Sequence, residues 1–260
     1  MNQFGVLFQK EWREHARNFK LIWIPIVFIL LGITEPIINH FLPQIIQSAG
    51  NVPEGSVIQF PEMTPEQILL SALNQYQFIG MLIIAFAFAG LVARERKNGT
   101  AAFLYVRPLS FPSYILSKWT ISNLILLGSL VLGMIGAAYY TDYLFGNFSI
   151  QRFIAMLGVY SVWMIFALSV TLLFSTLLRP GIAAALSVFF IAFFPMIDGL
   201  VLRYWPYTPF KLFSYAGMVM MGEVDMKDLW ITVAIAVLLI LICVTVSILM
   251  AKKKAADVKI

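Results

Sequence analysis

Long apolar stretches without a charged residue alternate with short polar segments along this chain. Five stretches lack Asp, Glu, Lys and Arg and approach the length of about 20 mostly apolar residues that a membrane-spanning helix needs: 67–93, 119–141, 153–178, 180–197 and 229–251. A sixth is uncharged from Leu21 to Thr34 and must continue past Glu35 and Pro36 in order to span. The pattern predicts six transmembrane helices, at about 21–41, 72–93, 119–140, 153–177, 181–202 and 229–251.

Residues 3–20 precede the first predicted span and have an amphipathic pattern. At helical spacing, bulky apolar residues fall on one side and basic residues on the other: Phe4, Leu7, Phe8, Trp12 and Phe19 against Lys10, Arg13, Arg17 and Lys20. This pattern is typical of a helix that lies in the plane of the lipid headgroups. Glu11 and His15 project among the apolar residues. Because an unpaired carboxylate is costly there, Glu11 either pairs with another protein group or reaches water on a shallow helix.

A second short apolar segment lies between the fifth and sixth predicted spans. Its run from Phe210 to Gly222 is too short to cross a bilayer. Tyr204, Trp205 and Tyr207 precede it and match an interfacial aromatic belt. The pattern favours an outer re-entrant segment before the last span, and an ordinary loop with a surface helix is the alternative. The fold class that follows is an all-α membrane protein with a single transmembrane domain over residues 1–260.

Composition and charge agree with this hydrophobic pattern and orient it. Hydrophobic residues make up 60% of the chain, and only 12% of residues are charged, about half the share of a soluble domain. The net charge of +5 is too small and too scattered to indicate nucleic-acid binding. Of the 18 lysines and arginines, fourteen flank the spans on the side of both termini and the remaining four lie on the other side. Since cytoplasmic loops keep the excess of positive charge, both termini are predicted to be cytoplasmic, in a bacterial cell membrane.

Candidate chemistry is sparse. Cys243 is the single cysteine, and His15 and His40 are predicted on opposite sides of the membrane. The chain therefore offers no internal disulfide and no Cys/His metal cluster. It also lacks a P-loop, a G-x-S-x-G elbow and an H-E-x-x-H helix. We expect no catalytic residue, no metal ligand and no cofactor bound by this chain.

Glu35 and Asp198 are the acidic residues inside the predicted spans, each near the outer boundary. Ionisable residues in spans often mark a transport pathway, so this pair either lines an outer gate or vestibule or forms wetted helix ends. Small residues recur at four-residue spacing in the second and third spans, which predicts close helix packing; the two rows are Ala85, Ala89, Ala93 and Ser129, Gly133, Ala137.

The polar segment 94–118 joins the second and third predicted spans. Asn98-Gly99 is a turn signal, and Thr100 can cap a short helix at about 101–106. Pro108 would end that helix, and a second short helix could begin near Pro112. Spacing alone does not distinguish this segment from an ordinary loop, which also needs turns and basic residues.

The same segment resembles type-2 ABC transporter permeases. In that family, charged residues lead into Gly-Thr, a short helix, a Leu/Arg-Pro step and a Lys before the third span. The corresponding positions here are Glu95, Gly99, Thr100, Leu104, Pro108 and Lys118. The pair Lys10-Glu11 resembles the family's opening element in the helix before span one. Ala101 and Ala102 depart from the pattern, because acidic residues usually follow Gly-Thr in the family.

The resemblance implies the membrane-spanning permease subunit of an exporter. Such a subunit pairs with a second six-span permease, identical or homologous, surrounded by membrane lipids. Each half docks on a separate cytoplasmic ABC ATPase subunit, which binds ATP with magnesium, and the 101–106 helix would be the coupling helix. The cargo is unidentified, and an amphipathic compound suits the apolar pathway. A secondary transporter and a non-transporting immunity or sensor protein are the alternatives.

Overall fold

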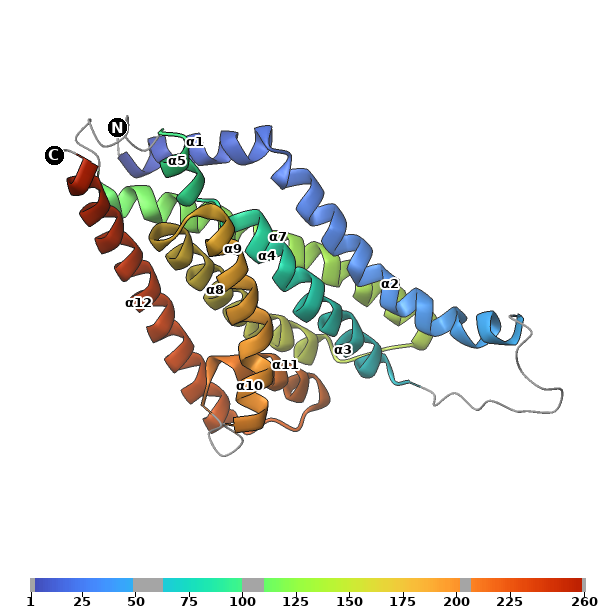
Figure 1. Cartoon of the computed structure of the whole chain (residues 1–260). Helices are drawn as coiled ribbons and strands as arrows, with labels where there is room; N and C mark the ends of the chain where they lie inside the picture. The colour runs from blue at the N-terminus through green and yellow to red at the C-terminus, as the bar shows by residue number, and fades with distance from the viewer. Residues whose placement is uncertain (1–2, 49–62, 100–109, 202–206, 259–260) are drawn as a thin grey trace.

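The computed structural model describes residues 3–48, 63–99, 110–201 and 207–258, and every regular element in these ranges is a helix. Four helices are long: α2 (Lys20–Ser48), α7 (Phe111–Phe145), α8 (Ile150–Leu177) and α12 (Met226–Val258). They run side by side with α2 and α12 on opposite flanks of the bundle (Figure 1). Five segments are long and apolar enough to cross a membrane: Lys20–Ile45, Pro65–Lys97, Phe111–Phe145, Ile150–Leu177 and Met226–Lys254.

The second candidate span consists of four consecutive helical pieces, which are α3 (Pro65–Gln75), η1 (Tyr76–Gly80), α4 (Met81–Phe88) and α5 (Ala93–Lys97). It begins seven residues before the predicted start, because Thr64 and Gln67 form a capping box. The helix is interrupted between α4 and α5, where the amides of Val92 and Ala93 donate to the Ser175 hydroxyl at 2.9 and 3.1 Å. A hydroxyl from α8 therefore satisfies amides that an uninterrupted helix would bond internally.

The fifth predicted span is also built from pieces: α9 (Pro180–Val188), the π-helical turn η2 (Phe189–Phe193) and α10 (Phe194–Val201). Pro195 explains the wide turn, since its ring has no N–H and would clash with the carbonyl four residues earlier. The apolar part, Pro180–Met196, is shorter than the five long segments. The predicted end of this span, residue 202, lies outside the described residues. The sixth span stays a prediction.

The amphipathic segment forms α1 (Gln3–Arg17), which ends where Phe19 adopts a left-handed conformation (φ 55°). The chain then turns sharply into α2 (Figure 1). The prediction of the apolar side of this helix is only partly correct. Leu7, Glu11 and His15 are buried, whereas Trp12 and Phe19 are exposed. The buried stripe has i, i+4 spacing and packs on α7. Its position in the headgroup plane stays a prediction.

The closest packing joins α2 and α7. Gly32 and Gly133 face each other there, and a Cβ on Gly133 would lie 2.5 Å from the Phe28 carbonyl oxygen. The Tyr76 hydroxyl donates to that same carbonyl at 2.7 Å. Ser129 and Ala137, from the same predicted row of small residues, are fully buried. The row thus serves close helix packing, as the sequence pattern indicates.

The segment before the last span is helical and well packed. It comprises the short turn η3 (Pro209–Lys211) and α11 (Leu212–Met221), which ends at Gly222 in a left-handed conformation (φ 81°). α11 buries one side, including Leu212 and Ala216, mainly against α8. It is therefore an integral part of the bundle, and its depth in a membrane stays a prediction.

Both chain termini lie at one end of the bundle, next to α1 and α5, whereas α10 and α11 lie at the other end (Figure 1). We call these the termini end and the opposite end. The two ends carry different chemistry: charged clusters occupy the first, and an apolar cavity with buried polar atoms occupies the second.

Candidate functional site

Buried charges from three helices meet at the termini end. Lys118 of α7 is fully buried, and its Nζ lies 2.8 Å from Glu11 Oε1 of α1 and 3.0 Å from Glu95 Oε1 of α5. Lys10 Nζ contacts the same two carboxylates, at 3.0 Å for Glu11. The Tyr114 hydroxyl donates to the other oxygen of Glu95. Two ammonium groups thus bridge two carboxylates from elements far apart in sequence; we call these four residues the ion cluster.

The ion cluster confirms that Glu11 pairs with protein groups. Burying one charge alone would cost several kcal/mol, which only close opposite charges and further hydrogen bonds can offset. Burial by itself would lower the pKa of Lys10, but the carboxylates of Glu11 and Glu95 outweigh that effect and raise the pKa above its usual value. Lys10 is therefore charged throughout the physiological range, and it holds α1 against α5.

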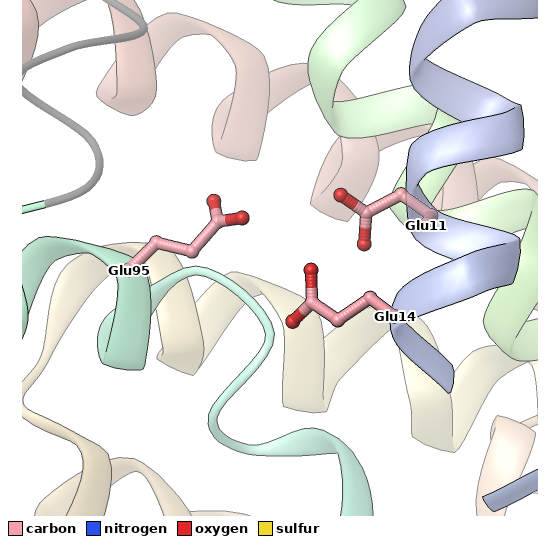
Figure 2. Close-up of side chains that lie close together, drawn as sticks. All are labelled: Glu11, Glu14 and Glu95. Carbon is pink, nitrogen blue, oxygen red and sulfur yellow. The ribbon is translucent and has the colours of Figure 1, made fainter. Parts of the chain in front are cut away.

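Figure 2 shows the carboxylates of Glu11 and Glu14 on α1 and of Glu95 on α5 directed toward one another. Their oxygens lie within 4.8 Å of one another, a spacing that could hold a metal ion. The lysine ammonium groups already occupy this space, with Lys10 Nζ also 3.5 Å from Glu14 Oε2. A cation would have to displace both lysines, so the donor set does not suit a metal.

His15 lies one turn beyond Glu11 and is also buried, with its ring edge-on to Phe88 at 6.2 Å between centroids. Neither ring nitrogen has a hydrogen-bond partner among the described residues. Burial, followed by the positive charges of Lys20, Lys118 and Lys10, lowers the His15 pKa to about 3. The imidazole is consequently neutral in the folded protein at neutral pH.

A second set of contacts joins α5 to the end of α8. The Arg96 guanidinium donates to the carbonyls of Thr176 at 2.6 Å and Ser175 at 3.1 Å. Lys254 of α12 donates to the Thr176 carbonyl at 3.0 Å. Cations commonly stabilise the last carbonyls of a helix, which have no partner within the helix. α5 is therefore held on one side by the ion cluster and on the other by α8.

The predicted loop 94–118 is shorter in the structure. α5 extends to Lys97, and α7 begins at Phe111 with Ser110 as its N-cap. The expected short helix near Pro112 is wrong, because a proline in the first turn is compatible with the start of a long helix. Lys118 is likewise not a loop residue, since it lies two turns inside α7.

Gly99 has φ 72°, which agrees with the predicted turn at Asn98-Gly99. The remaining predicted coupling positions, Thr100, Leu104 and Pro108, lie outside the described residues, as does the 101–106 helix. Those roles stay predictions.

At the opposite end, Glu35 is bound to neighbouring amides. Its Oε1 accepts from Gln75 Nε2 at 2.6 Å, and its Oε2 accepts from Asn39 Nδ2 at 2.9 Å. Glu35 lines a small cavity with Gln75 and Phe78. Asp198 of α10 is buried and lines a separate, larger cavity that Phe78 also borders. The structure thus places the two acids at neighbouring cavities that share one aromatic ring.

Several contact residues had no sequence signal. Tyr114, Ser175 and Gln75 are ordinary polar residues in helices, and their partners come from distant helices. Arg96 belongs to a basic segment of the sequence, which indicated only the orientation of the chain in the membrane. Isolated polar residues within an apolar stretch would have been the one available hint, because buried polar groups need partners.

Comparison with known proteins relates this chain to transporters. The family model described as ABC-2 family transporter protein matches residues 6–208. An uncharacterized transmembrane protein of Bacillus subtilis (strain 168), YxlG, is 38% identical over 189 residues, which are 72% of this chain and 73% of that protein.

Proposed function

The chain belongs to the ABC-2 family of transporter membrane proteins, and we propose that it is the permease subunit of an ATP-driven exporter. It is a multi-pass membrane transport protein, and in this family ATPase activity resides on a separate subunit. Membership of this family does not favour either alternative, which were a secondary transporter and a non-transporting immunity or sensor protein.

The ion cluster is the observation that carries the coupling proposal. It joins α1, α5 and the start of α7, the helices on both sides of the segment 98–110. A push on that segment by an ATPase would move α5 and α7 together, because buried charge pairs resist separation. α1 would follow through Lys10 and Glu11. Glu95, Gly99, Thr100, Leu104 and Pro108 form the coupling element in this proposal.

The energy for this movement comes from the partner. ATP with magnesium binds the ATPase subunits, whose association favours one of two permease conformations. Two permease chains, identical or homologous, would enclose the pathway. We place six spans in each chain, with both termini in the cytoplasm and α1 in the headgroup plane. The short α9–α10 segment provides the fifth span, and α11 sits at the outer surface.

The opposite end is then the exit. Glu35 and Asp198 would line an outer vestibule there, and α11 would form part of its wall. The amides of Gln75 and Asn39 that hold Glu35 suit a fixed, hydrated carboxylate. Phe78 borders both cavities, and a movement of its ring could join them.

Purification of the tagged chain from its native membranes in mild detergent tests this proposal. We expect an ABC ATPase subunit and a second permease chain to be retained, as identified by mass spectrometry, and magnesium-dependent ATPase activity in the complex. A folded, intact chain that retains no ATPase under conditions that preserve a known ABC complex would contradict the proposal.

A further inference from the structure

The larger cavity at the opposite end has the size and lining of a ligand site. Its volume is about 900 Å³, within the range of roughly 300–1,000 Å³ for small-molecule sites. Most of its lining is apolar and comes from the second span, α10, η3 and α11: Phe78, Leu82, Met196, Phe210, Phe213 and Met218. Such a wall suits the hydrocarbon part of a ligand.

The cavity is also accessible from outside the bundle. Phe78 and Met196 at its border are 72% and 68% exposed. In a membrane protein, an exposed apolar border of this kind faces lipid or a partner chain, because water would not favour it. A molecule with a hydrocarbon part could therefore enter sideways, and the cavity volume of about 900 Å³ leaves room for one.

Asp198 gives this apolar cavity a specific polar requirement. The side chain is only 3% exposed, and its Oδ1 is buried with no hydrogen-bond partner among the described residues. Buried polar atoms are almost always paired, so an unpaired carboxylate oxygen needs an explanation. Because a charged group inside a span is costly, such residues commonly serve a ligand or ion pathway. The missing partner is a hydrogen-bond donor, and a cation would stabilise the carboxylate most.

The other polar groups around the cavity do not supply that donor. Lys211 also lines the cavity, and Asp198 Oδ1 accepts no hydrogen bond from any described residue. Gln77 lines it as well, and its Oε1 accepts from Trp163 Nε1 at 2.8 Å. Phe210 and Tyr215 also line the cavity, and aromatic rings of this kind can attract a cation.

Two of the segments that line the cavity, the second span and the α9–α10 segment, contain a π-helical turn. η1 carries Phe78, and η2 ends five residues before Asp198. π-helical turns occur frequently at functional sites, because they shift side chains out of the regular helical register. Their presence on two walls of one cavity supports a binding role.

We propose that this cavity binds a cationic amphipath, with its ammonium group on Asp198 and its hydrocarbon part on the Phe78, Met196 and Phe213 side. This inference rests on the proposed function, for which it names the chemical class of the cargo. An uncharged amphipath of the same length would offer the Asp198 carboxylate at most a neutral hydrogen-bond donor, and an anionic one would repel it, so both would bind more weakly.

Equilibrium binding to the full-length chain in phosphatidylcholine nanodiscs tests this assignment. The probes are dodecylammonium, dodecanol and dodecanoate, which share one hydrocarbon chain, and empty nanodiscs measure partition into lipid. We expect saturable binding of dodecylammonium that Asp198→Asn weakens at least about tenfold, the size of a lost charge-assisted hydrogen bond. Glu223→Gln is the matched control, because this exposed acid at the same end does not line the cavity.

A second variant keeps the carboxylate and fills the cavity. Met218→Trp should also weaken dodecylammonium binding, so the assignment does not depend on one substitution. Equal affinity for the wild-type chain and Asp198→Asn, or for dodecylammonium and dodecanoate, would overturn it. Since the permease is assayed without an ATPase, this failure is distinct from failure to co-purify an ATPase, which concerns the proposed function alone.

Discussion

Glu11, Glu95 and Lys118 show how single buried charges are tolerated at the termini end. Each has an opposite charge within hydrogen-bond distance, and each comes from a different helix. Removing one partner leaves the others buried and uncompensated, which costs more than the pair contributes. These residues therefore control both stability and the attachment of α1.

Lys118→Met removes the fully buried ammonium group while keeping an unbranched side chain. We expect destabilisation of about 3 kcal/mol or more, because Glu11 and Glu95 lose a shared partner. The measurement is thermal unfolding in detergent. Lys97→Met is the control, since Lys97 is exposed on α5 and should change stability little.

A double variant sharpens the same prediction. Glu11→Gln combined with Lys118→Met removes a charge of each sign. The double variant should therefore be destabilised by less than the sum of the destabilisations of the two single variants. Strict additivity would show that the two charges do not interact, contrary to the ion cluster.

His15 gives the protein a specific sensitivity to acid. Its pKa is about 3 in the folded protein and near 6.5 when unfolded, so the unfolded chain alone takes up a proton as the pH falls through this window. Stability is full above the unfolded pKa and is lost progressively below it. From about pH 7.5 to about pH 5 the loss should be about 2 kcal/mol.

His15→Gln, which is neutral at every pH, should lack this part of the acid sensitivity. Unfolding of the two proteins across the same pH range in detergent measures the difference. Parallel stability curves for wild type and variant would show that His15 does not remain neutral in the folded protein.

At the scale of elements, interruptions and close contacts decide how the helices fit together. The second span is broken between α4 and α5 because Ser175 satisfies the freed amides. α2 and α7 instead approach closely because Gly32 and Gly133 lack side chains. The break in the second span thus allows a polar contact between helices, and the glycines allow two helix backbones to approach closely.

Gly133→Ala tests the close approach of α2 and α7. The new Cβ would lie 2.3 Å from the Tyr76 hydroxyl and 2.5 Å from the Phe28 carbonyl oxygen, so backbone would have to move. We expect destabilisation of about 1–3 kcal/mol, the usual cost of overpacking, as measured by thermal unfolding. Gly128→Ala in the same helix meets nothing within 4 Å and should be neutral or slightly stabilising. Similar effects at both positions would contradict the close packing.

At the scale of the whole molecule, the chain presents chemically different ends. The ion cluster and both termini lie at one, and Asp198 and α11 lie at the other (Figure 1). Export by an ATPase-driven permease requires that these ends face different compartments.

Cysteine labelling in intact cells tests that orientation. Cys243, the single cysteine, is replaced by serine, and then Lys97→Cys or Glu223→Cys is introduced; both positions are exposed, at opposite ends. A membrane-impermeant maleimide should label Glu223→Cys from outside and Lys97→Cys only after permeabilisation. The reverse pattern would place the termini outside.

Sequence patterns predicted much of the architecture. Four of the five uncharged stretches, together with the segment that continues past Glu35, located the five long apolar segments to within several residues. Glu11 was recognisable as a carboxylate that needs a partner or water. Boundaries were less accurate, because caps such as Thr64 and Ser110 extend helices into polar segments. The continuous start of α7 was missed, since a proline at Pro112 is compatible with both a break and a first turn.

Local sequence patterns were enough to predict a helical, membrane-embedded chain, because the length of an apolar stretch and the charges that flank it govern its insertion into a bilayer. The polar groups that meet could be identified only from the packing of the helices. Lys118 looked like a loop residue, and its place between Glu11 and Glu95 depends on how α1, α5 and α7 pack. The sequence allowed Asp198 to be either a wetted helix end or part of an outer vestibule. Its place in an apolar cavity, with an oxygen that lacks a hydrogen-bond partner among the described residues, depends on α10 and α11 folding together. Contacts between distant segments depend on packing, which spacing along the chain does not specify.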